Sequence, residues 1–401
     1  MSAPRVAIVG GGPAGLSAAI ALRRTGIGPV IVIDRDPAPG GIPRHCGHYP
    51  FGWREFRRLY RGPDYARRLV AEARAAGVTI LSATTVTAIH AGPVLELSSH
   101  DGLSSLLPER VLLATGCRET PRAPRAVGGT KPAGIATTGT LQTMVYGSGL
   151  RPFRAPVILG TELVAFSALI TATHAGIRPV AMVEPGPRAT ARFPAALFPS
   201  LHGIPLLTGT SVEAVEGHDK VEAVILRDRN GTRRLVCDGL LVTGRFRPDA
   251  VLLRDSGIEA DPATGGPVVD AWGRTSLDGV FAAGNLLRPA ETAGWCWDEG
   301  RRVAGAIAAS LAGGLPAPPP RLTLADPVLG WAMPQRPSAA GTEPRLHLRL
   351  SRPARGQVVA TGGAGDRVGF AVDSRPERRI VLEAATLPAG PVTLTFREDP
   401  A

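Results

Sequence analysis

A short stretch of the chain, residues 39–52, is unusually dense in side chains that can do chemistry. Arg44, His45, Cys46 and His48 fall within five positions and are surrounded by glycines. A thiol could act as a nucleophile, and imidazoles could carry protons or bind a metal. Cys46 has no second cysteine nearby, so dithiol chemistry is excluded at this position. Three potential ligands are also too few for a metal centre, and we expect a loop that packs on a cofactor.

The cofactor is indicated by a glycine-rich turn near the amino end, residues 10–15. An apolar strand is predicted before it at 5–9, and a segment with helical spacing follows at 16–24. A second apolar strand, 30–33, ends in Asp34, nineteen residues after the last glycine. Strand, glycine turn, helix and strand with a terminal acid form the pattern of a dinucleotide-binding fold.

Each residue of this pattern has a physical task. Gly10 permits the tight turn, Gly12 lets the backbone approach a pyrophosphate, and Gly15 allows the helix to pack closely on the strand. The free N–H groups at the start of the helix then face the phosphates. Asp34 can accept hydrogen bonds from the ribose hydroxyls. The alternative is a glycine-rich turn in some other α/β domain.

Two later segments are each predicted to be a buried strand that ends in small residues. They are residues 110–116 and 279–285. With these segments the chain resembles flavoproteins with two dinucleotide-binding domains, such as thioredoxin reductase and glutathione reductase. The resemblance implies that the first pocket holds FAD and that Asn285, where the family usually has Asp, faces the ribityl-phosphate arm. It also implies that the helix after Thr292 and Ala293 starts beneath the flavin ring, where its dipole would stabilise negative charge.

A second nucleotide-binding pattern in the middle of the chain is altered. A strand at 157–159 leads into a turn that carries Glu162 where a fingerprint glycine is expected, and a helix to His174 and a strand ending in Glu184 follow. A glutamate adds bulk and negative charge at the place for two phosphates. We therefore expect a retained scaffold that does not bind NAD(P).

A closer resemblance rests on several separated motifs over about the first 315 residues. The chain is similar to the FAD-containing subunit of opine oxidases, D-hydroxyproline dehydrogenases and hydrogen cyanide synthase, which oxidise amino or imino acids at a C–N bond. The motifs are Gly40 to His48 with Gly52 to Phe56, Gly62 to Ala66, Thr138 to Gln142, and Ala283 to Leu287 with Glu291 to Ala293.

This resemblance implies a set of site residues. Candidates for binding a substrate carboxylate or transferring a proton are Arg44, His45 and His48, with Cys46 beside them. The residues expected to bind FAD are Gly10, Gly12, Pro13, Ala14, Gly15, Asp34, Arg35, Gly41, Val86, Thr115, Gly116, Gly284, Asn285, Thr292 and Ala293.

Two alternatives remain open. The chain could be a non-catalytic subunit that holds FAD as a relay or structural cofactor beside a second flavin subunit. It could also be a single-cysteine NADH oxidase or disulfide reductase that uses Cys46, although such enzymes need an intact nicotinamide site, against which Glu162 argues. Trp295 and Trp297 could stack on substrate or flavin, or could simply pack in the core.

The cysteine count bears on partners. There are four cysteines, and none follows Cys296. Many relatives hold a [2Fe–2S] centre in this subunit or in a small companion, and four scattered thiols cannot supply its ligands. We expect no iron–sulfur cluster on this chain. Its expected partners are a small iron–sulfur protein and a second flavin subunit.

Composition sets the outer limits. The net charge is +11, and all but two of the 45 cations are arginines spread along the chain, so we expect no nucleic-acid partner. No apolar stretch approaches the ~18 residues of a membrane span. The chain enters an apolar strand at once, and we expect no leader and a cytoplasmic location.

The predicted fold class is α/β, with two Rossmann-like domains and a small C-terminal β domain. We expect a discontinuous FAD domain at 1–120 and 245–315, an inserted NAD(P)-like domain at 121–244, and a linker with a β-rich domain at 316–401. Alternating segments predict the C-terminal strands at 345–350, 357–360, 367–372, 379–383 and 391–396. Trp331 could anchor this domain or be a covered hydrophobe.

Overall fold

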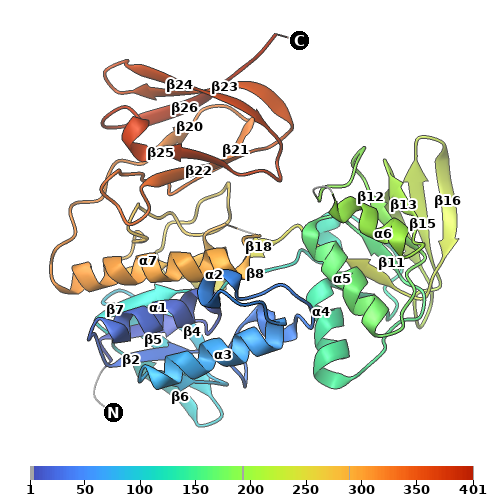
Figure 1. Ribbon diagram of the computed structural model, residues 1–401, viewed down its shortest axis with the longest axis horizontal. Helices are drawn as coiled ribbons and strands as arrows, with labels where there is room; N and C mark the ends of the chain where they lie inside the picture. The colour runs from blue at the N-terminus through green and yellow to red at the C-terminus, as the bar shows by residue number, and fades with distance from the viewer. Residues whose placement is uncertain (1–3, 192–193, 289, 401) are drawn as a thin grey trace. The chain divides into compact units, whose positions relative to one another are not determined.

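The computed structural model describes residues 4–191, 194–288 and 290–400. The chain forms two compact units (Figure 1). The first unit contains residues up to 41, 66–117 and everything from 248 onward, and the second contains 42–65 and 118–247. Residues 42–65, which the sequence assigned to the FAD domain, therefore group with the second unit.

The first unit is built on a five-stranded parallel sheet in the order β19-β7-β1-β2-β3. Strands β1 and β2 are fully buried, as expected for a parallel sheet covered on both faces. The strands are β1 (Val6–Val9), β2 (Val30–Ile33), β3 (Thr79–Leu81), β7 (Arg110–Leu113) and β19 (Val280–Ala282).

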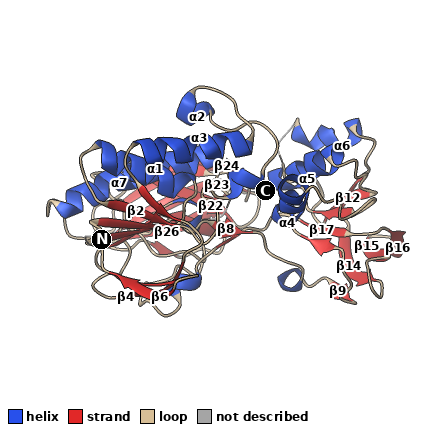
Figure 2. Ribbon diagram, turned by 90° about the horizontal axis from the view of Figure 1, so that it is seen from below, coloured by secondary structure: helices blue, strands red, loops and turns tan. Residues whose placement is uncertain are grey.

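Helices α1 (Pro13–Arg24) and α7 (Ala293–Leu311) lie side by side along this sheet (Figures 1 and 2). A Cβ atom at Gly300 of α7 would lie 2.1 Å from the carbonyl oxygen of Ala14, so only glycine permits this close approach. Ser17 of α1 also donates a hydrogen bond to the Trp297 carbonyl at 2.7 Å. The start of α7 is therefore fixed against the start of α1.

Further elements of the first unit complete the FAD-type domain. An antiparallel sheet of β4 (Thr85–His90), β5 (Val94–Ser99) and β6 (Gly102–Leu106) packs its apolar side chains into the same core as β1 and β7. Helix α3 (Gly62–Ala75) runs from the second unit into the first.

The second unit repeats the parallel design. Its five-stranded sheet has the order β10-β17-β11-β12-β13, and a four-stranded sheet has the order β16-β15-β14-β9. The strands are β9 (Gly128–Gly129), β10 (Ile135–Ala136), β11 (Val157–Leu159), β12 (Ala181–Glu184), β13 (Leu206–Thr208), β14 (Ser211–Glu216), β15 (Ala223–Asp228), β16 (Gly231–Val236) and β17 (Leu240–Val242). Its helices are α2 (Trp53–Phe56), α4 (Thr138–Gln142), α5 (Leu163–His174) and α6 (Phe198–Leu201). The short strands β8 (Cys117–Arg118) and β18 (Arg247–Pro248) pair with each other.

The C-terminal region forms two antiparallel-rich sheets with orders β20-β26-β23-β24 and β21-β22-β25. The five predicted strands are present, as β22 (Arg345–Leu350), β23 (Ala354–Gly362), β24 (Arg367–Ser374), β25 (Ile380–Glu383) and β26 (Val392–Glu398). Two strands were not predicted, β20 (Thr323–Leu324) and β21 (Leu329–Met333). Trp331 and Met333 of β21 join the core that contains β19, so Trp331 anchors this region on the parallel sheet. The predicted α/β fold class is thus confirmed.

Candidate functional site

The first glycine turn lies at the carboxyl end of β1, the central strand of its sheet. Gly10 has φ +110°, and a Cβ atom there would lie 2.4 Å from the Ala114 carbonyl oxygen. At Gly15 a Cβ atom would lie 2.0 Å from the Gly10 oxygen. At Gly12 the nearest atom would be the Gly41 Cα, 3.9 Å away, so this side of the turn is open.

Helix α1 starts at this open side without a side-chain cap and with Pro13 at its first position. Its first N–H groups therefore have no partner within the helix, which suits the binding of phosphate oxygens. The residues predicted to bind the pyrophosphate thus fit a dinucleotide. The assignment of these individual residues to FAD stays a prediction.

Asp34 is buried at the end of β2. Its Oδ2 accepts a hydrogen bond from the Gly11 N–H at 2.7 Å, and its Oδ1 accepts one from the Asp36 N–H at 2.9 Å. The carboxylate is therefore held in one orientation by the turn that it faces. Each oxygen of a carboxylate can accept more than one hydrogen bond, which suits the two hydroxyls of a ribose.

The end of β7 is tied to a later part of the chain. The Thr115 hydroxyl donates to the Asp249 carbonyl at 2.8 Å, and the Asp249 N–H donates to the Gly116 carbonyl at 2.9 Å. The Asp249 carboxylate in turn lies 3.0 Å from the Arg35 guanidinium. Thr115, Gly116 and Arg35 are thus brought together, whereas Val86 is buried in the core of the β4–β6 sheet.

The region around the start of α7 contains the last group of predicted FAD residues. A Cβ atom at Gly284 would lie 2.9 Å from the Ala14 Cβ, which again requires glycine. The Asn285 side chain accepts from the Glu291 N–H at 2.8 Å and donates to the Glu291 carbonyl at 3.0 Å. Asn285 therefore closes the loop that leads to Thr292, the N-cap of α7, whose side chain makes no capping bond.

The turn of the second unit has the same backbone design as the first. Gly160 has φ +115°, and a Cβ atom there would lie 2.6 Å from the Thr243 Oγ1. Glu184, like Asp34, ends the next strand and is held by the turn, through hydrogen bonds from the Thr161 hydroxyl and the Gly186 N–H. At the third position the first turn has Gly12 and the second has Glu162, and the second turn also has Thr161 and Ala165 where the first has Gly11 and Gly15.

The Glu162 carboxylate is folded onto the turn. Its Oε1 accepts a hydrogen bond from the Arg245 N–H at 2.8 Å, and a Cβ atom at Gly244 would lie 2.4 Å from its Cδ. Burial raises the pKa of Glu162, opposed by the Arg245 hydrogen bond and the nearby Arg125 guanidinium. Glu162 is the N-cap residue of α5, but its side chain makes no capping hydrogen bond and lies against the Gly244–Arg245 backbone. A negative charge thus lies beside the helix N-terminus at which the phosphates of a dinucleotide bind in this kind of fold.

Of the candidate catalytic residues in the segment 39–52, only some lie within contact distance of one another. The Arg44 Nη2 lies 3.1 Å from the His45 Nε2, and the Thr143 hydroxyl lies 3.3 Å from the His45 Nδ1. His48 instead faces its own loop, with its Nδ1 2.8 Å from the Tyr49 carbonyl. The structure therefore brings Arg44 and His45 together and leaves His48 separate from them.

Cys46 is buried beside this pair. Its thiol lies 3.5 Å from the Gln142 Oε1 and from the Ile42 carbonyl. Burial, with a smaller effect of Glu119, raises the pKa of Cys46 to about 12. The thiol therefore stays protonated near neutral pH, in contrast to the thiolates of redox-active cysteines.

The two tryptophans of α7 are covered by arginines. The Arg379 guanidinium lies 4.3 Å from the centre of the Trp295 ring, and the Arg301 guanidinium lies 4.7 Å from that of Trp297. These contacts do not distinguish stacking on a substrate or flavin from packing in the core, and both interpretations stay predictions. Within the described ranges, no three His, Cys, Asp or Glu side chains gather as a metal site would require.

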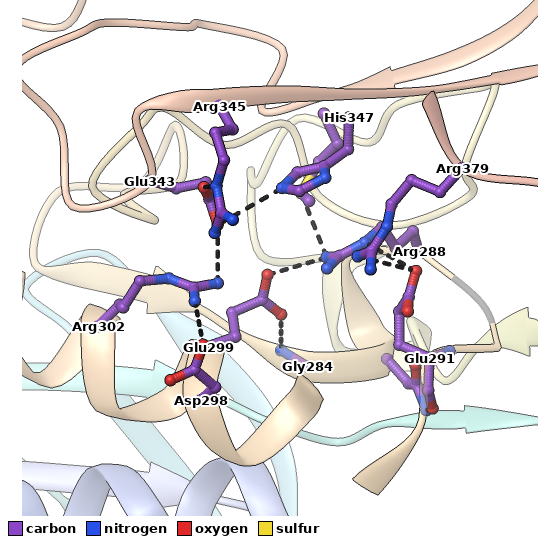
Figure 3. Close-up of polar contacts among 12 residues, drawn as sticks. Gly284, Arg288, Glu291, Asp298, Glu299, Arg302, Glu343, Arg345, His347 and Arg379 are labelled. Carbon is purple, nitrogen blue, oxygen red and sulfur yellow. Dashed lines mark hydrogen bonds and ion pairs between the residues drawn. The ribbon is translucent and has the colours of Figure 1, made fainter. Parts of the chain in front are cut away.

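A buried network of charged residues, which the sequence did not predict, surrounds the start of α7 (Figure 3). The Glu299 Oε2 accepts from the Gly284 N–H at 2.7 Å, and its Oε1 accepts from the Arg288 Nη1 at 2.9 Å. Three guanidinium groups lie 3.5–3.7 Å from the Glu291 Oε1, those of Arg288, Arg349 and Arg379. Gly284, Arg288 and Glu291 are thus held by hydrogen bonds and ion pairs from Glu299 of α7 and from arginines of the C-terminal region.

A second part of this network reaches the C-terminal sheets (Figure 3). The Arg302 guanidinium lies 2.6 Å from the Asp298 carboxylate and 2.7 Å from that of Glu343. Glu343 also pairs with Arg345 at 2.9 Å and with His347 at 3.5 Å. Burial would raise the pKa of Glu343, but the hydrogen bonds from His347 and Arg345 outweigh it and lower the pKa to about 2.

Comparison with known proteins gives the class. Residues 4–309 match the family model of pyridine nucleotide-disulphide oxidoreductases, so the chain belongs to that family, whose members bind FAD. Among solved structures, thioredoxin reductase of T. acidophilum matches 78% of this chain and 100% of its own, with a TM-score of 0.66 and 21% identity. That level of identity supports the fold alone.

Two curated relatives are informative. The A subunit of opine oxidase from Agrobacterium tumefaciens (strain Ach5) is 27% identical over 92% of this chain and 74% of its own length. The ferredoxin reductase component of chlorobenzene dioxygenase from Cupriavidus sp. (strain PS12) is also 27% identical, over 78% of this chain and 75% of its own. The chain is therefore similar to subunits of multicomponent oxidoreductases. No helix among the described residues is both long and apolar enough to cross a membrane.

Proposed function

We propose that this chain is an FAD-containing oxidoreductase subunit that oxidises a C–N bond of an amino acid, an imino acid or an opine. The observation that carries this proposal is the contrast between the two turns. The first has Gly12, where a Cβ atom would meet nothing closer than the Gly41 Cα at 3.9 Å, whereas the second has Glu162, whose carboxylate lies against the Gly244–Arg245 backbone. A flavoprotein chain that does not take electrons from NAD(P)H takes them from a substrate or from a partner subunit, and we propose the substrate. The match to the opine oxidase chain over 92% of this one supports a C–N substrate.

In this proposal the first unit holds FAD. The open turn and the N-terminus of α1 bind the pyrophosphate, Asp34 binds the adenosine ribose, and Thr292 and Ala293 at the start of α7 face the flavin. When bound there, FAD would supply the hydride-acceptor chemistry that oxidation of a C–N bond requires. The protein residues orient the substrate and stabilise charge.

We assign Arg44 and His45 to the recognition of the substrate carboxylate. A guanidinium provides several fixed N–H donors for a carboxylate, and the adjacent imidazole can exchange a proton near neutral pH. Cys46 has no part in this chemistry because its buried thiol stays protonated. In this proposal the electrons leave to a partner protein, as the names of the matched relatives suggest.

The test is anaerobic reduction of the flavin in the purified chain. D-hydroxyproline, glycine and opines such as octopine are mixed separately with the protein, and loss of the oxidised flavin absorbance is followed. The proposal expects at least one of them to bleach the flavin. Failure of all of them would assign substrate oxidation to a partner and leave this chain as an FAD relay.

A further inference from the structure

A surface loop in the second unit, residues 49–61, has a fixed shape. Phe51 and Tyr60 exchange backbone hydrogen bonds at 3.0 and 2.8 Å and so close the loop around helix α2. On its inner side, the Phe56 ring packs against the rings of Tyr60 and Tyr65 at 5.7 and 5.9 Å. Because this small aromatic core holds the backbone, the outer side chains are presented in a defined arrangement.

The outer side of the loop is apolar and exposed. Trp53 is 60% exposed, Tyr49 54% and Leu59 51%. Apolar side chains stabilise a folded protein only when they are buried. These three exposed side chains, within thirteen residues, therefore do not stabilise the chain on its own. Exposed large apolar groups that occur together indicate a surface that another molecule covers.

The same loop is strongly basic. It carries Arg54, Arg57, Arg58 and Arg61, all exposed, and Glu55 is its single acid. The Glu55 carboxylate accepts a hydrogen bond from the Tyr65 hydroxyl at 2.7 Å. The Arg61 guanidinium lies 5.7 Å from the centre of the exposed Tyr49 ring. Tryptophan, tyrosine and arginine are also the residues that contribute most to binding at protein interfaces.

We propose that the loop 49–61 is the docking surface for a small acidic iron–sulfur protein of the ferredoxin type. This inference rests on the proposed function, in which electrons leave the chain to a partner. The surface is confined to one short loop and is therefore small. Transient complexes between redox proteins also have small interfaces. Its cations would steer an acidic partner during association, and Trp53 would supply the buried contact at the centre.

The test measures binding rather than turnover. The purified FAD-loaded chain is titrated with an oxidised plant-type [2Fe–2S] ferredoxin by isothermal titration calorimetry at low and at high ionic strength. We expect binding that weakens with salt, and a Kd at least tenfold higher for Trp53→Ala and for the double variant Arg57→Glu/Arg58→Glu. The matched control is Arg229→Glu/Arg233→Glu at the β15–β16 hairpin, which makes the same charge change and should leave Kd unchanged.

Several outcomes would overturn the proposal. These are no binding of the ferredoxin, equal weakening by both double variants, or tighter binding of a single-stranded DNA oligonucleotide through the same arginines. Concentration-dependent dimerisation that Trp53→Ala abolishes would identify a second copy of the chain as the occupant instead. Thermal unfolding of each variant confirms that it is folded. Amino-acid bleaching of the flavin is measured on the same samples, so that loss of docking and failure of the proposed function are separately visible.

Discussion

At the scale of single residues, we propose that Glu162 prevents NAD(P)H from binding to the second unit, so that the electrons come from the substrate. Glu162 occupies the position that corresponds to Gly12, in a turn that shares with the first a positive φ at its leading glycine, Gly160, and an acid at the end of the next strand, Glu184. A carboxylate there repels phosphates and fills the space that they would need. Removal of this one side chain should therefore change the cofactor preference of the second unit.

Glu162→Gly is expected to create NADH binding. The substitution removes both the negative charge and the bulk at the start of α5, so NADH should bind at least tenfold more tightly than to the wild type. Fluorescence titration with NADH measures the Kd. Leu163→Gly is the matched control, because it places a glycine at the exposed neighbouring position without opening the turn. Equal, weak binding by both variants would show that Glu162 is not the block.

Cys46→Ser is expected to leave activity intact. The thiol is protonated near neutral pH because its pKa is raised to about 12, so no thiolate is lost on substitution. The rate of amino-acid bleaching and its dependence on pH, between about pH 6 and about pH 9, should agree with the wild type within about twofold. A tenfold loss of rate would instead support a thiol mechanism.

At the scale of elements, the start of α7 depends on buried charge. Glu299 bonds both the Gly284 N–H and the Arg288 guanidinium, and it therefore fixes the loop that leads to Thr292. Both side chains of the pair are less than a tenth exposed, 3% for Arg288 and 7% for Glu299. Loss of one partner leaves the other as an uncompensated buried charge, which is costly.

Glu299→Gln should lower the free energy of unfolding by about 3 kcal/mol, because it leaves Arg288 without its closest counter-charge. The FAD content of the purified protein should fall as well, since the loop 284–291 is no longer held. Urea unfolding and the flavin-to-protein absorbance ratio measure the two effects. Glu213→Gln removes an exposed pair with Arg227 and should change neither.

Acid should weaken the attachment of the C-terminal sheets to α7. The pKa of Glu343 is lowered to about 2 in the folded chain from an ordinary value of 4.5. Its stabilisation is fully present above the ordinary value and is lost as the pH falls from about 4.5 to about 2, by up to about 3 kcal/mol. Urea unfolding at several pH values gives the free energy of unfolding as a function of pH. Between pH 4.5 and about pH 2 this free energy should fall less steeply for Glu343→Gln than for the wild type. Identical slopes would contradict the assignment.

The elements that the sequence predicts best are those with a strong local pattern. The strands β1 and β2, the glycine turn and the five C-terminal strands follow from apolar runs, glycine spacing and alternation. The start of α7 at Ala293 was not predicted from its pattern, since the apolar period is clear only from Val303 onward. The charged network was missed because Glu299 and Arg288 look like surface residues in sequence. Their other partners, such as Arg379, are distant in the chain.

At the scale of the whole molecule, the chain belongs to a family whose members bind FAD, and it is similar to subunits of multicomponent oxidoreductases. Together with the proposed loss of NAD(P)H binding at Glu162, this similarity leads us to propose that the chain acts as one subunit of a larger electron-transfer system. Co-purification with a second flavin subunit is the expected behaviour of the chain in its own cell. An isolated chain with full turnover and no partner would argue against this view.

The most direct measurement compares two reductants of the purified FAD-loaded chain in the absence of oxygen. If the substrate supplies the electrons, an amino acid, an imino acid or an opine bleaches the flavin. NADH and NADPH then reduce it at least a hundredfold more slowly. Rapid bleaching by NADH, with no response to any of the C–N substrates, would contradict this prediction.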